Sequence, residues 1–150
     1  MRERRAGFAW TAITVFGVAF AFVEAAVAIS LKRLYYPEGW RPPFHALPGD
    51  ANLLEQAREL ATLLMIASVA AAGRPSWREG IARGLWIFGI WDLGYYAFLL
   101  WLTGFPSSFL DPDLVFLVPI VWVFPVWVPV AVSIVSLLVA LRLHASARRR

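Results

Sequence analysis

The amino-acid sequence predicts an all-α integral membrane protein: a single domain over residues 1–150, built as a bundle of four transmembrane helices. Hydrophobic residues make up 60% of the 150-residue chain, and charged residues only 16%. The mean hydropathy of +0.65 is too high for a soluble domain, in which about half of the residues are apolar. Four segments also have the roughly 20 predominantly apolar residues that a membrane-spanning helix needs.

The four predicted spans, taken in order, cover about residues 8–30, 53–72, 81–103 and 114–141. The first has an apolar run that is long for a cleaved signal peptide, so we expect it to be retained. Residues 31–52 connect the first two spans. This segment is rich in proline and aromatic residues, which favours an ordered cap on the outer surface over a free linker.

The fourth span contains three prolines, Pro119, Pro125 and Pro129. Each proline removes a backbone donor, so we expect a helix that is kinked at these positions. An alternative is that the carbonyl oxygens released one turn earlier line a cavity.

Basic residues predict the orientation of the bundle. They precede the first span, flank the connection between the second and third spans and follow the last span: Arg2, Arg4, Arg5, Arg74, Arg78, Arg83, Arg142, Arg148, Arg149 and Arg150. The positive-inside rule then places both termini in the cytoplasm and the chain in the cell (inner) membrane. We attribute the net charge of +4 to insertion and to contact with anionic lipid, and we expect no nucleic-acid partner.

Residue types that are missing exclude several kinds of chemistry. The chain has no cysteine, which removes disulfides, dithiol redox chemistry and thiolate metal sites. The two histidines, His45 in the outer loop and His144 in the cytoplasmic tail, are expected to be solvated and not to hold haem. No cofactor is predicted. Glycines at 80, 84, 89 and 94 lie just before and within the third span, inside the same predicted helix, and are expected to let neighbouring helices approach closely.

Several carboxylates lie within the predicted spans. Glu24 and Glu59 would each lie about 10 Å below the outer surface, so they could share a site with Arg58. Asp92 would lie near the midplane, about 17 Å from the outer end of its span. A carboxylate there costs at least about 2.5–3.5 kcal/mol. Since one arginine cannot neutralise three acids, some of them must be protonated, wetted by a cavity or bound to a cation.

Each acid also has a purely structural interpretation. Glu24 could pair with Arg58 and hold the first two helices together. Asp111 and Asp113 could begin the fourth helix, because "DPDLVF" places proline and acids where a helix N-terminus favours them. Asp92 is expected to bond to the hydroxyl of Tyr95 or Tyr96, or to a polar group on the first or second span, and to be protonated when no cation is bound.

The predicted ligand- or proton-binding residues combine these acids with nearby aromatic side chains. The set is Glu24, Arg58, Glu59, Asp92, Tyr95 and Tyr96, with Glu55, Asp113, Trp91 and Trp122 as secondary members. If a hard cation binds, oxygen atoms of Glu24, Glu59 and Asp92 would be its ligands.

In layout the chain resembles two groups of membrane protein. Glu24 in the first helix and the aromatic third helix resemble small multidrug transporters, whereas the strong arginine bias differs from the dual orientation typical of that group. Asp92 and Asp113 resemble the two outward-facing aspartates of the lipoprotein signal peptidases, but the asparagine-rich and arginine-containing motifs around those aspartates are missing here. Neither resemblance assigns a role to a residue.

Three classes of function fit these residues. The first is a site, open to the outer side, that binds or translocates a cation or a proton-coupled ligand. The second is an acid–base enzyme acting on a lipid or isoprenoid. The third is a subunit of a homo-oligomer or of a larger membrane complex. The lipid bilayer is the one partner common to all three.

Overall fold

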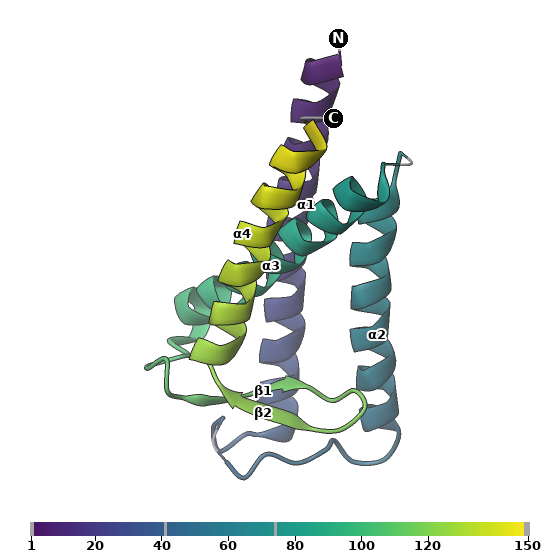
Figure 1. Cartoon of the computed structure of the whole chain (residues 1–150). Coiled ribbons are helices and arrows are strands. Elements are labelled where there is room, and N and C mark those ends of the chain that lie inside the picture. Colours follow the sequence, from purple (N-terminus) through teal and green to yellow (C-terminus); the bar gives the residue numbers. More distant parts are fainter. Residues whose placement is uncertain (1, 41, 74, 149–150) are drawn as a thin grey trace.

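The protein is mostly helical in the computed structural model, which describes residues 2–40, 42–73 and 75–148 (Figure 1). Its elements are α1 (Arg2–Tyr35), α2 (Asp50–Ala71), α3 (Trp77–Thr103), β1 (Pro112–Phe116), β2 (Trp122–Pro125) and α4 (Trp127–Arg148). Three helical segments are long and apolar enough to cross a membrane: Ala9–Tyr35, Trp77–Thr103 and Trp127–Ala147. The prediction of a helical membrane protein is confirmed at this level.

Helix α3 is the centre of the bundle, because α1 and α4 both pack against it. The helices approach closely where α3 has glycine. A Cβ atom on Gly89 would lie 2.6 Å from Cγ of Leu137 on α4, and one on Gly94 would lie 2.7 Å from Cβ of Ala21 on α1. No side chain larger than hydrogen fits at these two positions without movement of the neighbouring helix.

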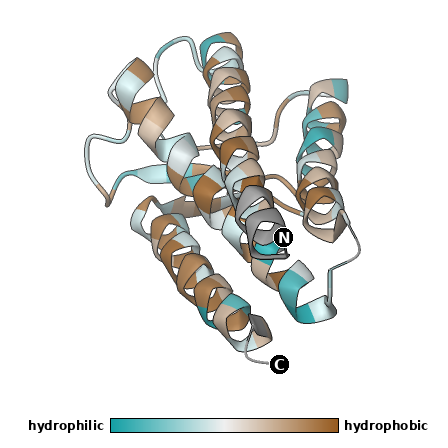
Figure 2. Cartoon of the chain, turned by 90° about the horizontal axis from the view of Figure 1, so that it is seen from above, coloured by the Kyte–Doolittle hydropathy of each residue, from teal (hydrophilic) through white to brown (hydrophobic). Residues whose placement is uncertain are grey.

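Helix α2 stands apart from α1 and contacts the rest of the bundle mainly through α3 (Figures 1 and 2). Its exposed face is apolar and includes Leu53, Leu54, Leu60, Leu63, Leu64 and Met65. Its buried face carries Glu55, Glu59 and Thr62. The helix is therefore amphipathic in the sense opposite to that of a helix in a soluble protein, with its polar side chains turned inward.

The prediction of a kinked helix over residues 114–141 is wrong in its first half. Strands β1 and β2 form an antiparallel hairpin in which Asp113 lies opposite Phe124 and Leu114 opposite Val123. The fold is consequently not all-α. Valine, phenylalanine and tryptophan favour strands, and the prolines occupy positions where no donor is needed. Pro119 lies between the strands, Pro125 ends β2, and Pro129 lies in the first turn of α4.

The two ends of the molecule differ in content. The start of α1, the connection from α2 to α3 and the end of α4 lie at one end, which we call the terminal end (Figure 1). The cap loop over residues 36–49 and the β-hairpin lie at the other, which we call the hairpin end. Of the arginines used to predict the orientation, Arg74, Arg149 and Arg150 lie outside the described residues, and the segments that contain the others gather at the terminal end.

Candidate functional site

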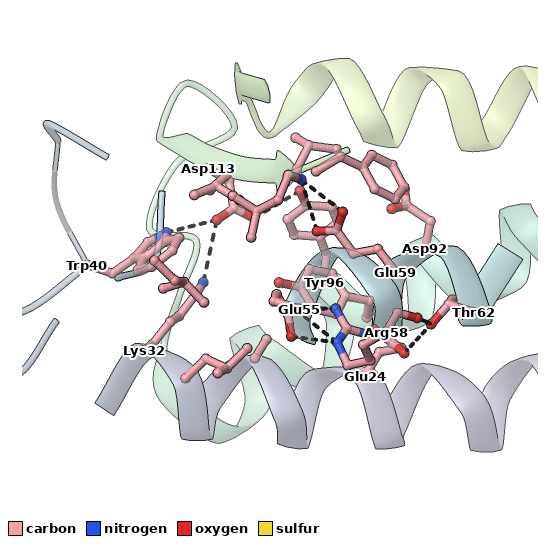
Figure 3. Close-up of a pocket in the computed structure, with 18 of the residues that line it drawn as sticks. Glu24, Lys32, Trp40, Glu55, Arg58, Glu59, Thr62, Asp92, Tyr96 and Asp113 are labelled. Carbon is pink, nitrogen blue, oxygen red and sulfur yellow. Dashed lines mark hydrogen bonds and ion pairs between the residues drawn. The ribbon is translucent and has the colours of Figure 1, made fainter. Parts of the chain in front are cut away.

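A pocket lies at the hairpin end, between α1, α2, α3, β1 and the cap loop. It encloses about 870 Å³, counting the part that is open to its surroundings. Its lining includes nine of the predicted residues: Glu24, Glu55, Arg58, Glu59, Trp91, Asp92, Tyr95, Tyr96 and Asp113. The close-up in Figure 3 draws most of the lining residues.

Arg58 joins α1 to α2 at the wall of the pocket. Its Nη1 donates a hydrogen bond to Oε2 of Glu24. Its Nε donates to both carboxylate oxygens of Glu55, at 2.9 Å each (Figure 3). Thr62, one turn further along α2, donates its hydroxyl to Oε1 of Glu24 at 2.9 Å. The structural pairing of Glu24 with Arg58 is therefore present, and this arginine is fully occupied by two carboxylates.

Glu59 has a different partner from the one expected. Its two carboxylate oxygens accept the backbone N–H of Leu117, at 3.0 and 2.9 Å, from the chain just after β1 (Figure 3). The side chain is buried, with only 6% of the residue exposed. None of the described hydrogen bonds joins Arg58 to Glu59. They therefore do not show the expected role of Arg58 as the neutraliser of Glu59.

Asp92 is buried near the middle of α3, with 9% of the residue exposed. Its Oδ2 accepts a hydrogen bond of 2.7 Å from the hydroxyl of Ser133 on α4. The expected bond to Tyr95, Tyr96 or a group on the first two helices is wrong. Ser133 lies on α4, which begins after the hairpin. Its hydroxyl reaches Asp92 near Gly89, where α3 and α4 approach each other closely.

Asp113 is not the start of a helix, as the sequence indicated, but the centre of a buried network. It is fully buried on β1, and it accepts Nε1 of Trp40 at 2.8 Å, Nζ of Lys32 at 3.5 Å and the hydroxyl of Tyr96 at 3.1 Å. The ammonium of Lys32 also lies 4.3 Å from the ring centroid of Trp40 and 4.1 Å from that of Phe105. Both contacts are cation–π interactions.

Asp111, two residues earlier, is not at a helix start either. Its Oδ2 accepts three hydrogen bonds in a tight turn: the hydroxyl and backbone N–H of Ser107, at 2.7 and 2.8 Å, and the backbone N–H of Ser108 at 3.0 Å. The hydrogen bonds from Ser107 and Ser108 lower the pKa of the Asp111 carboxyl from its ordinary value. Asp111 thus shapes the loop outside the pocket.

The pocket includes residues that sequence reasoning had assigned elsewhere. Lys32, Tyr36 and Trp40 were not among the predicted site residues, yet all three line the pocket. Trp40 lies in a loop, five residues after the end of α1, so no helical periodicity in the sequence indicates that it lines the pocket. Trp122 is the one predicted residue that does not line this pocket, and it lies instead in a smaller hollow beside Glu59.

The terminal end holds a separate polar cluster. Glu79 at the start of α3 accepts Nε1 of Trp10 at 3.1 Å and Nε of Arg83 at 3.3 Å, and it bonds to Nδ1 of His144 at 3.0 Å. The ring centroids of Trp10 and His144 are 4.4 Å apart. His144 is therefore packed between helices, and the expectation that it is solvated is wrong.

The charges that line the large pocket do not balance. Five carboxylates line it, whereas the cationic lining residues are Arg58 and Lys32. Arg58 pairs with Glu24 and Glu55, and Lys32 pairs with Asp113. Within the described part of the chain, Glu59 and Asp92 have hydrogen-bond donors but no ion-pair partner. Carboxylates therefore outnumber cationic side chains in the lining of this pocket.

Comparison with protein-family models, with curated proteins and with solved structures finds no match for this chain.

Proposed function

We propose that the protein is a small multi-pass membrane protein whose pocket binds, and in a proton-coupled manner releases or translocates, a positively charged ligand. The observation that carries the proposal is the charge imbalance of the pocket, in which Glu59 and Asp92 are buried without a cationic partner among the described residues. Buried carboxylates of this kind are stabilised either by a bound cation or by a proton.

The aromatic wall favours an organic cation over a bare metal ion. Tyr36, Trp40, Trp91, Tyr95 and Tyr96 line the pocket together with the carboxylates. Aromatic faces attract ammonium groups, as they already do for Lys32. Among the described residues, no group of three or more His, Cys, Asp or Glu side chains is placed to hold a metal ion. Glu24, Glu59 and Asp92 therefore act in this proposal as charge partners and not as a metal cage.

The proposal includes α2 as a fourth membrane span. Its 22 residues would extend about 33 Å at 1.5 Å per residue, enough for a hydrocarbon core of about 30 Å. Except for Asp50 at its exposed first turn, its charged residues line the pocket and its leucines face outward, which is the arrangement that a lipid-exposed helix requires.

We also propose that the hairpin end faces outward and that both termini are cytoplasmic, as the arginine distribution indicates. The absence of native cysteine permits a direct test. A cysteine replacing Glu38, exposed in the cap loop, should react with a membrane-impermeant maleimide on intact cells. One replacing Ser146, exposed near the end of α4, should react only after the membrane is opened. The reverse pattern would contradict this orientation.

Binding is tested with tetramethylammonium as the probe, on protein in phosphatidylcholine nanodiscs, with intrinsic tryptophan fluorescence as the readout. We expect saturable binding that weakens as the pH falls, because protons compete with the cation for the carboxylates. Glu59→Gln and Asp92→Asn should each weaken binding about tenfold, as expected for loss of one charged partner. Glu38→Gln, an exposed acid outside the pocket, is the matched control and should bind normally.

Proton coupling is tested on the same samples in weak buffer with a pH-sensitive dye. Tetramethylammonium binding to the wild type should release protons, and Asp92→Asn should fold normally but release fewer. If no variant of a pocket carboxylate changes either the affinity or the proton release, the pocket is a structural polar core and the proposal is wrong.

A further inference from the structure

A second hollow opens on the side of the molecule, next to the pocket. We call it the lateral notch, and its lining comprises Glu59, Leu60, Leu63, Phe116, Val118 and Trp122. It lies between α2 and the hairpin, and its volume of about 490 Å³ includes space that is open to the surroundings. Apart from Glu59, every lining residue is apolar or aromatic.

The lateral notch and the pocket are adjacent, because they share two lining residues. Glu59 and Phe116 line both hollows. The carboxylate of Glu59 is bound to the chain just after β1 through the N–H of Leu117, so it lies where the hairpin meets α2 (Figure 3). A molecule that places a positive group beside Glu59 therefore has the apolar lining of the lateral notch next to that group.

The outer rim of the notch faces the surroundings of α2. Leu60 is 53% exposed, Leu63 41% and Trp122 42%, so these rim side chains are open to the surroundings of the molecule. In a bilayer this face is in contact with acyl chains, so an apolar tail that lies in the notch stays in a hydrocarbon environment. Tail length then governs how strongly a ligand is concentrated in the membrane from which it enters.

We infer that the ligand is a membrane-resident amphiphile with a cationic amine or ammonium head and a hydrocarbon tail, and that it enters sideways from the bilayer with its head beside Glu59 and its tail in the lateral notch. This inference rests on the proposed function and adds a substrate class and a route of entry. The pocket charge selects the head, since carboxylates outnumber cations there. The apolar lining of the notch, which is adjacent to the pocket at Glu59 and Phe116, selects the tail.

The test maps where the tail lies. The probe is an alkyl trimethylammonium with a photoreactive diazirine in its chain, added to the protein in phosphatidylcholine nanodiscs, and crosslinked peptides are identified by mass spectrometry. We expect crosslinks to concentrate on Leu60, Leu63 and Trp122. Excess tetramethylammonium and the variant Glu59→Gln should each reduce them about tenfold. The same tail on a sulfate head should label exposed apolar positions without this preference.

A pair of variants tests the notch itself. Leu63→Trp fills it and should sharply reduce crosslinking of the tailed probe at Leu60 and Trp122. Leu64→Trp, on the exposed face of the same helix but outside both hollows, is the matched control and should not. Both variants are first checked for an unchanged unfolding temperature.

The outcomes separate the two proposals. If tetramethylammonium binds in a manner that depends on Glu59, but crosslinks spread evenly over the apolar faces of α1, α2 and α4, the lateral route is wrong while the cation site stands. If crosslinks concentrate on Tyr36 and Trp40, the tail leaves through the cap and the inference is also overturned. If tetramethylammonium does not bind at all, the proposed function fails first.

Discussion

The carboxylates at the two ends of the bundle differ in the balance of partners that surround them. At the terminal end one carboxylate, Glu79, receives contacts from three side chains on three helices, Trp10, Arg83 and His144. At the hairpin end five carboxylates line one pocket with two cationic side chains. The first arrangement uses an acid to tie helices together. The second leaves carboxylates in excess of cationic side chains, which a structural tie does not require, and the proposed ligand site rests on this excess.

The comparison also separates acids within the hairpin end. Asp113 and Glu24 have cationic partners and hold α1 against β1 and α2, whereas Glu59 and Asp92 have only neutral donors. Substituting the first kind should cost stability, and substituting the second kind should cost affinity. Each of the following variants tests this distinction between acids with cationic partners and acids with neutral donors.

Asp113→Asn should destabilise the protein by about 3–5 kcal/mol, because it leaves the largely buried ammonium of Lys32 without its carboxylate. Thermal unfolding in detergent, followed by tryptophan fluorescence, measures the loss. Removing the charge at the same time in the double variant Lys32→Met/Asp113→Asn should recover part of it. An unfolding temperature for Asp113→Asn equal to that of the wild type would show that the network is not a structural tie.

Gly89→Ala should cost about 1–3 kcal/mol, because the added methyl group would lie 2.6 Å from Leu137 Cγ and 2.9 Å from the backbone oxygen of Ser133. The matched control is Gly84→Ala on the same helix, whose added Cβ would make an ordinary contact of 3.6 Å with Ala70. That variant should be neutral or slightly stabilising, since alanine favours a helix over glycine by about 0.5–1 kcal/mol.

The Gly89 variant also tests the position of Asp92. Pushing α4 away lengthens the hydrogen bond from Ser133 to Asp92, now 2.7 Å, so tetramethylammonium affinity should change together with stability. Equal unfolding temperatures for the two glycine variants would contradict the close packing of α3 on α4.

Glu79→Gln should have the smallest effect, a loss of about 1.5 kcal/mol from weakened charged hydrogen bonds to Arg83 and His144. Its distinguishing feature is what stays the same: tetramethylammonium affinity should equal that of the wild type, because Glu79 lies at the opposite end from the pocket. A change in affinity that matches that of Glu59→Gln would mean that the two ends are coupled, and the comparison would fail.

Much of the site was predictable because a polar side chain in an apolar helix is energetically favourable in only a few positions. Glu24, Glu59 and Asp92 stand out in sequence as charges inside spans, and helical rise alone placed Glu24 and α2 at matching depth, where Arg58 and Thr62 now meet Glu24. Lys32 and Trp40 were not predictable as pocket residues. They follow the apolar run of α1, where a solvated or interfacial position satisfies the same pattern.

Composition and periodicity by themselves determined that this is a helical membrane protein with acids buried inside it, since hydrophobic length and the cost of buried charge are local properties of the chain. Tertiary structure decided which acid meets which partner. It also decided that residues 112–125 pair as a hairpin instead of extending α4. A run of valines, prolines and aromatics satisfies a helix or a strand equally by hydropathy. The choice depended on the place of this segment in the fold, where Asp113 reaches Lys32 and the chain after β1 reaches Glu59.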